Sequence, residues 1–188
     1  MTFGMLTATV GLVGLSFIDV GTSYNAIWPF QMLLGIGLAS TMPASAATAM
    51  GAVDHAKAGV ASGVVNASRQ VGGALGIAVL GGIGSTLAAN AWSDKIANLP
   101  PARHALAEKL TPLVQGGRGN VIERLTGSPK AGAEALDAFM SGVHVALLTA
   151  GALTFLAAIV AFVGLRNVRV RPSEESPRDP AATAMVEA

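Results

Sequence analysis

The chain has 188 residues, of which 52% are hydrophobic and 12% charged, and its mean hydropathy is +0.56. Soluble domains carry about 25% charged residues, so this composition indicates an integral membrane protein. The net charge of +1, without a cluster of Lys and Arg, argues against a nucleic-acid-binding surface.

The chemistry of sites is also limited by composition. The absence of cysteine excludes disulfides, thiolate metal sites and cysteine nucleophiles. The three histidines are far apart in sequence and form no metal-ligand spacing. We find no Ser/His/Asp arrangement, paired carboxylates or metal-ligand set in or beside the apolar segments. We therefore expect neither an enzyme nor a protein with a bound metal or cofactor.

The first apolar segment, residues 1–18, ends at Asp19. A secretory signal peptide would begin with basic residues, and the first one in this chain is Lys57. The segment is therefore predicted to be a transmembrane helix. Its apolar run of about 16 residues is short for a hydrocarbon core of ~30 Å, so we expect a span that is clipped at its start.

Residues 26–50 form the second predicted span. Trp28 and Phe30 flank Pro29 at its start, which fits aromatic residues at a membrane interface and a proline in the first helical turn. Pro43 lies in mid-span, where it removes a backbone hydrogen bond and is predicted to kink the helix.

Residues 58–89 form the third predicted span, which contains a single charged residue, Arg69. At ~1.5 Å per residue, Arg69 lies roughly 15 Å along the helix from Gly59. Helical winding collects the small and polar residues within an arc of roughly 140°. These residues are Gly59, Ser62, Gly63, Asn66, Arg69, Gln70, Gly73 and Gly76.

Two small-residue pairs in this span are typical of helices that pack closely in lipid. They are Gly59 with Gly63 and Gly72 with Gly76. No hydrophobic effect draws helices together between lipid tails, so close approach through small residues takes its place. We expect these glycines, with Gly73, to be helix-packing positions.

The charge of Arg69 has two interpretations. An unpaired charge in lipid costs several kcal/mol, so its side chain should face a water-filled cavity, a carboxylate or the carbonyls of another helix. Arg69 then belongs to a transport pathway or its gating, together with Asn66 and Gln70. Alternatively, Arg69 is a packing residue or a snorkelling residue near the membrane boundary.

Residues 90–141 hold 11 of the chain's 23 charged residues. Turn-forming residues interrupt this segment at Pro100-Pro101, Gly116-Gly117 and Gly127-Ser128-Pro129. The pattern predicts a solvent-facing external loop with short helices near residues 102–114 and 130–139. Its charges are interpreted as solvated faces and not as a binding site.

Residues 142–165 are uncharged and form the fourth predicted span, and residues 166–188 are predicted to be a disordered tail. Arg166, Arg169 and Arg171 directly follow the last span, which indicates a cytoplasmic C-terminus. Four spans place both termini on the same side. We therefore expect a multi-pass protein of the cell inner (plasma) membrane with the long loop outside.

The third span carries a specific string, Ala58-Gly-Val-Ala-Ser-Gly-x-x-Asn66-x-x-Arg69-Gln70-x-Gly72-Gly73-x-x-Gly76-x-Ala78. With the preceding Leu34-Gly-Ile-Gly…Pro43 and the long outer loop, it resembles the C-terminal part of the major facilitator superfamily. The likeness is to the 14-span drug:proton antiporters and covers residues 1 to about 170. It implies an all-α integral membrane fold whose four helices are the last part of the C-terminal bundle.

The resemblance also implies a function. Such proteins export drugs or other small amphipathic molecules by alternating access, coupled to protons. Asn66, Arg69 and Gln70 would line the C-domain side of a central cavity, and the packing glycines would let their helix shift against its neighbours. No Asp or Glu lies inside a predicted span, so the residues that carry the proton would belong to N-terminal helices absent from this chain.

Two alternatives remain at this point. The chain is a fragment of a longer reading frame or a truncated gene product, and we expect it not to transport by itself. Otherwise it is a small integral membrane protein with a structural or helix-association role. The partners implied by the first interpretation are the lipid bilayer, the missing N-terminal helices and a drug-like substrate, with no nucleic acid.

Overall fold

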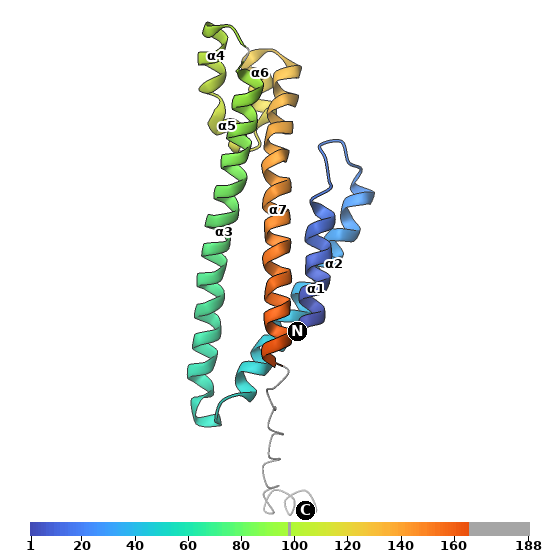
Figure 1. Ribbon diagram of the computed structural model, residues 1–188, viewed down its shortest axis with the longest axis vertical. Coiled ribbons are helices and arrows are strands. Elements are labelled where there is room, and N and C mark those ends of the chain that lie inside the picture. The colour runs from blue at the N-terminus through green and yellow to red at the C-terminus, as the bar shows by residue number, and fades with distance from the viewer. Residues whose placement is uncertain (98, 166–188) are drawn as a thin grey trace, which may run out of the picture.

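The computed structural model describes residues 1–97 and 99–165, and these residues form helices without any β-strand. The elements in chain order are α1 (Thr2–Leu15), α2 (Tyr24–Gly51), the 3-10 helix η1 (His55–Lys57), α3 (Ala58–Ile96), α4 (Pro101–Glu108), α5 (Thr111–Gln115), α6 (Gly119–Thr126) and α7 (Pro129–Leu165) (Figure 1). The predicted disordered tail, residues 166–188, and the arginines used to orient the chain lie outside the described residues.

The long helices α3 and α7 run side by side, and α1 packs against both α7 and α2 (Figure 1). The helices α2 and α3 contact each other far less than these pairs do. The short helices α4, α5 and α6 lie together at one end, where they connect α3 to α7. The molecule therefore has a long apolar part and, at one end, a small helical unit. This unit consists of α4, α5 and α6 with the adjoining ends of α3 and α7, and we call it the cap.

Three helices are long and apolar enough to cross a membrane, namely α2, α3 and α7. Their most apolar windows have mean hydropathies of 1.3, 1.7 and 2.4. The first predicted span, residues 1–18, corresponds to α1, which is apolar but only 14 residues long. At ~1.5 Å per residue it is about 21 Å long, shorter than a typical hydrocarbon core. The chain is an all-α membrane protein, as its composition predicts.

Two helices are longer than the spans expected from sequence. The helix α3 continues past residue 89 to Ile96, and α7 begins at Pro129, well before residue 142. The short helix expected near 130–139 is thus the first part of α7. Both extensions have a tertiary cause, because their side chains enclose the apolar cluster of the cap.

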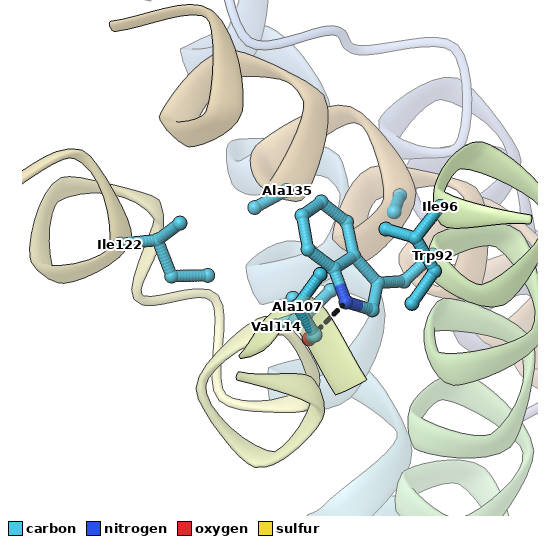
Figure 2. Close-up of a cluster of buried hydrophobic side chains, with 7 residues drawn as sticks. Trp92, Ile96, Ala107, Val114, Ile122 and Ala135 are labelled. Atoms are coloured by element: carbon cyan, nitrogen blue, oxygen red, sulfur yellow. Dashed lines mark hydrogen bonds between the residues drawn. The ribbon is translucent and has the colours of Figure 1, made fainter. Parts of the chain in front are cut away.

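The cap has its own hydrophobic core (Figure 2). Its buried members come from both long helices and from the loop helices between them. They are Trp92, Ile96, Ala107, Val114, Ile122, Ala135 and Ala138. The indole Nε1 of Trp92 donates a hydrogen bond to the backbone carbonyl of Ala107, with an N–O distance of 3.0 Å. This bond satisfies the one polar atom of a buried indole, which would otherwise carry a desolvation cost.

The last turn of the cap is set by local chemistry. Gly127 ends α6 with a φ of 64°, in the left-handed region that glycine adopts without steric cost. Pro129 then opens α7, where its missing N–H removes no helical hydrogen bond. The turn-forming residues that the sequence places here therefore mark the boundary between two helices.

Backbone contact at glycines joins the helix pairs. A Cβ on Gly142 of α7 would collide with the carbonyl oxygen of Gly84 on α3. A Cβ on Gly37 of α2 would lie 2.5 Å from the backbone nitrogen of Ala8 and the carbonyl oxygen of Gly4 on α1. Only glycine allows helices to approach this closely, which is how helices in lipid gain van der Waals contact.

We predict that Gly142→Ala destabilises the protein by about 1–3 kcal/mol, the usual cost of forcing a methyl group into a packed contact. The measurement is the unfolding transition of the purified protein in mild detergent. Gly164→Ala is the matched control, because Gly164 lies on the same helix and a Cβ there meets nothing within 4 Å. Equal stability of the two variants would contradict backbone packing between α3 and α7.

Candidate functional site

The polar residues predicted from sequence lie on one stretch of an unbroken helix. Asn66, Arg69 and Gln70 are three and four positions apart in α3, which places them on one face. All three side chains are exposed in the described part of the chain. The helix thus presents two amides and one guanidinium side by side.

Arg69 is joined to α2. Its Nη2 donates hydrogen bonds to the backbone carbonyl of Met42, at 2.8 Å, and to the hydroxyl oxygen of Ser45, at 2.7 Å. The Ser45 hydroxyl in turn donates to the Met42 carbonyl at 2.8 Å. We call these three groups the Arg69 network. A carbonyl of another helix is one of the three surroundings expected for this charge.

The α2 side of the network is built around a proline. Pro43 lies between Met42 and Ser45 and cannot donate a hydrogen bond to the carbonyl four residues earlier. Helical structure nevertheless continues through it to Gly51. The kink predicted at Pro43 stays a prediction, but the proline places a locally weakened stretch of backbone next to the guanidinium.

Hydroxyl groups around Pro43 are satisfied within α2 itself. Ser40 donates to the carbonyl of Ile36, Thr41 to that of Gly37, and Thr48 to that of Ala44. Such bonds to the preceding turn satisfy side chains that lipid cannot solvate. Among these residues Ser45 differs, because its hydroxyl also accepts a hydrogen bond from α3.

Asn66 and Gln70 are not part of the network. Within the described residues, neither side chain makes a hydrogen bond to another group. The five glycines predicted for packing are similarly uncovered, since a Cβ on any of them would meet nothing within 4 Å. They are Gly59, Gly63, Gly72, Gly73 and Gly76. Their packing role and the pathway role of the amides therefore stay predictions.

Some residues of interest escaped the sequence analysis. Ser45 carried no signal beyond its position two residues after a mid-span proline. Asp19 directly follows the first predicted span and His144 lies at the start of the last one, so the predicted topology places both on the same side of the membrane, which is the available signal that they meet. Within the described residues, no group of three or more His, Asp or Glu side chains gathers to hold a metal ion.

We predict that Arg69 and Ser45 are energetically coupled. In a double-mutant cycle of Arg69→Ala and Ser45→Ala, the coupling energy should be roughly 0.5–2 kcal/mol, because the bond joins a charged donor to a hydroxyl in a low-dielectric site. Unfolding free energies in detergent provide the measurement. The control cycle uses Thr48→Ala, whose hydroxyl bonds only within α2, and should be additive. Additivity in both cycles would remove the network from the energetics of the fold.

The chain is similar to several drug resistance proteins. It is 31% identical to the tetracenomycin C resistance and export protein of Streptomyces glaucescens over 98% of this chain and 35% of that protein. It is 33% identical to the multidrug resistance protein Stp of Mycobacterium tuberculosis over 95% of this chain and 34% of that protein. No protein-family model and no solved structure matches it.

A third relative is the methyl viologen resistance protein SmvA of Salmonella typhimurium, which is 26% identical over 90% of this chain and 34% of that protein. The chain therefore spans about a third of the length of the curated relatives it matches. These similarities agree with the string of residues in α3 and with three helices long enough to span a bilayer. The chain is a multi-pass membrane protein that, over nearly its whole length, resembles part of the drug resistance and export transporters of the major facilitator type.

Proposed function

We propose that these residues form the C-terminal third of a proton-coupled multidrug exporter of the 14-span type. The exported molecules are drugs or other small amphipathic compounds, moved by alternating access of two helical halves. The names of the relatives support this class of cargo, because they describe resistance to, or export of, tetracenomycin C, methyl viologen and multiple drugs.

The observation that carries the proposal is the polar face of α3. At Arg69 this face is joined to α2. Among the described residues its two amides make no hydrogen bond, and a Cβ at Gly59, Gly63, Gly73 or Gly76 would meet nothing within 4 Å. Amides and glycine backbone are poor lipid-facing groups, since lipid cannot hydrogen-bond to them. We assign this face to the central cavity and to close contact with the remaining two thirds of the transporter.

The Arg69 network gives the face a mechanical role. Two helices that touch little elsewhere are held by one guanidinium at a proline-weakened stretch of α2. Such a contact can be broken and re-formed while each helix stays intact, which suits a gate between helices of the moving halves. Arg69 is the gating residue in this proposal, and Asn66 and Gln70 contact the cargo.

The proposed orientation follows the positive-inside rule. The C-terminus and the connector with η1 lie in the cytoplasm of the cell, and the cap with α4, α5 and α6 lies outside. The spans are residues 1–18, 26–50, 58–89 and 142–165, within a bacterial inner membrane. The acidic residues that carry the coupled proton through the membrane belong to the part of the transporter outside this chain.

An accumulation assay in a pump-deficient strain tests the proposal. Cells that express residues 1–188 alone should accumulate a fluorescent cationic drug as the empty-vector cells do, whereas a longer frame that includes these residues should lower accumulation. The reason is that four helices do not supply two rocking halves. Proton-dependent efflux by residues 1–188 themselves would instead indicate a small oligomeric transporter. No efflux from either form would favour a structural role.

In the full-length transporter, we predict that Arg69→Ala lowers export by about tenfold or more, because a hydrogen bond from a charged group is worth about 1.5–3 kcal/mol. The measurement is the initial rate of drug efflux at matched expression. Lys109→Ala is the control, since Lys109 is an exposed residue at the end of α4. Wild-type export by both variants would exclude Arg69 from the mechanism.

A further inference from the structure

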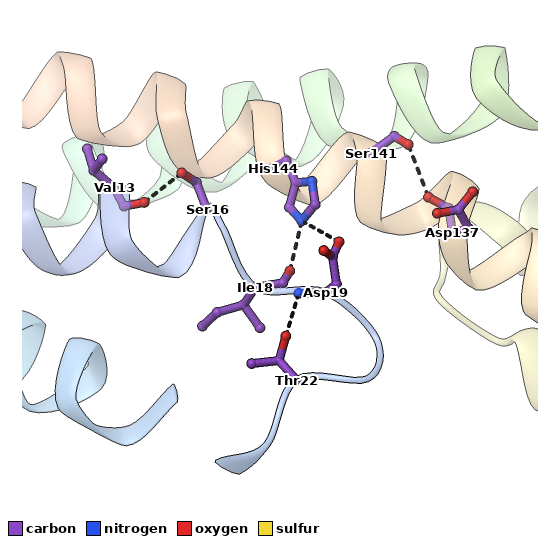
Figure 3. Close-up of polar contacts among 8 residues, drawn as sticks. All are labelled: Val13, Ser16, Ile18, Asp19, Thr22, Asp137, Ser141 and His144. Atoms are coloured by element: carbon purple, nitrogen blue, oxygen red, sulfur yellow. Dashed lines mark hydrogen bonds and ion pairs between the residues drawn. The ribbon is translucent and has the colours of Figure 1, made fainter. Parts of the chain in front are cut away.

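A second polar contact, separate from the Arg69 network, joins segments that are far apart in sequence. It lies at the end of the spans nearer the cap. His144 of α7 meets the connector between α1 and α2, residues 16–23 (Figure 3). Its Nε2 lies 2.8 Å from the carbonyl oxygen of Ile18 and 3.7 Å from Oδ1 of Asp19. The contact bridges 126 positions of sequence, so it ties the first helix pair to the last helix.

The connector presents Asp19 in an ordered turn. The backbone N–H of Asp19 donates to the hydroxyl of Thr22, and the N–H of Thr22 donates to the carbonyl of Asp19, both at 2.9 Å. Before it, the buried hydroxyl of Ser16 donates to the carbonyl of Val13. Local hydrogen bonds thus order the backbone of the turn that carries the Asp19 carboxylate.

The level of His144 along α7 is informative. From His144 to Leu165 the helix rises about 31 Å, which matches the ~30 Å thickness of a hydrocarbon core. In the orientation proposed above, the imidazole therefore lies at the external surface of the inner membrane. Its side chain is 28% exposed and that of Asp19 is 77% exposed, so protons from outside can reach both.

No other charge near this level competes with the pair. The helices α1 and α5 carry no charged or titratable residue, and α2 carries only Tyr24. On α7 itself, Asp137 lies two turns away and is paired with Lys95 of α3. The other charged residues of α7 are Lys130 and Glu134, which pair with each other in its first turns, where Glu123 of α6 contacts Gly132. The helix α6 also carries Arg124, and α3 also carries Arg69 and Asp94. Within the described residues, Asp19 is therefore the ion that faces His144.

We propose that His144 and Asp19 form a proton-binding site at the outer end of the transporter, whose occupancy holds the connector between α1 and α2 against α7. Histidine is the side chain that gains or loses charge between pH 5 and 8. The protonated ring donates from Nε2 in its only form and attracts the carboxylate. The neutral ring lacks that attraction and has a tautomer that cannot donate to Ile18.

The direction of the pH effect follows from these charges. When the ring carries a second proton, it faces the carboxylate as a cation, so the connector is attached. As the pH rises through the range in which histidine loses its proton, the attachment weakens. An exposed ion pair of this kind changes the equilibrium between attached and detached connector by about two- to fivefold.

Spin-label mobility at Gly21 tests the site. A Cβ at Gly21 meets nothing within 4 Å, and these residues contain no native cysteine. Gly21→Cys is labelled in the full-length transporter, with any cysteines outside this chain replaced, in nanodiscs without drug. We expect the immobilised fraction of the label to be higher at pH 5.5 than at pH 8. A pH-independent spectrum would overturn the proposal.

Two variants assign the effect to the pair. His144→Gln keeps a donor for Ile18 but cannot titrate, and should abolish the pH dependence. Asp19→Asn removes the carboxylate at an exposed position and should weaken the pH dependence, so it decides the case if His144→Gln is not recovered. His104→Gln, on α4 of the cap, is the control and should keep the wild-type profile. Full pH dependence in either pair variant would overturn the proposal, whatever the outcome of the export assays, because the label reports on the connector alone.

Discussion

Inside a bilayer, a polar group has to find its hydrogen-bonding partner within the protein. Arg69 meets this constraint through the carbonyl of Met42 and the hydroxyl of Ser45. Because α2 and α3 share little other contact, this polar network is the main tie between them. A contact made of a few directional bonds can be exchanged for another set at small net cost, which is the property that a gating element requires.

Glycine stabilises the packing of the long helices in a different way. At Gly142 and Gly37 the backbones of paired helices touch, which joins α7 to α3 and α2 to α1. The glycines on the polar face of α3 are uncovered, because a Cβ at any of them would meet nothing within 4 Å among the described residues. Since both faces have the composition of a packing surface, the uncovered one supports the proposal that the rest of the transporter lies against it.

The cap is organised by another physical effect. Outside the bilayer, water drives apolar side chains together, and the large buried residues Trp92, Val114 and Ile122 gather there. The same effect makes α3 and α7 continue beyond their apolar spans, because their ends complete this core. His144 and Asp19 lie between the membrane-spanning part and the cap, where water reaches both side chains although packed helices hold their backbones.

Local chemistry let the sequence alone determine the all-α membrane class, the approximate extent of α2 and the boundary at Gly127 and Pro129. Hydrophobic length, glycine and proline act over a few residues, so no tertiary knowledge was needed. The family was likewise readable from the string around Arg69. Only the tertiary structure decided which carbonyl Arg69 meets, where α3 ends, that α7 continues unbroken from the cap into the last span, which glycines touch and that His144 reaches Asp19. Each of these depends on groups far apart in sequence, up to 126 positions for His144, whose distances are set by helix packing and not by local pattern.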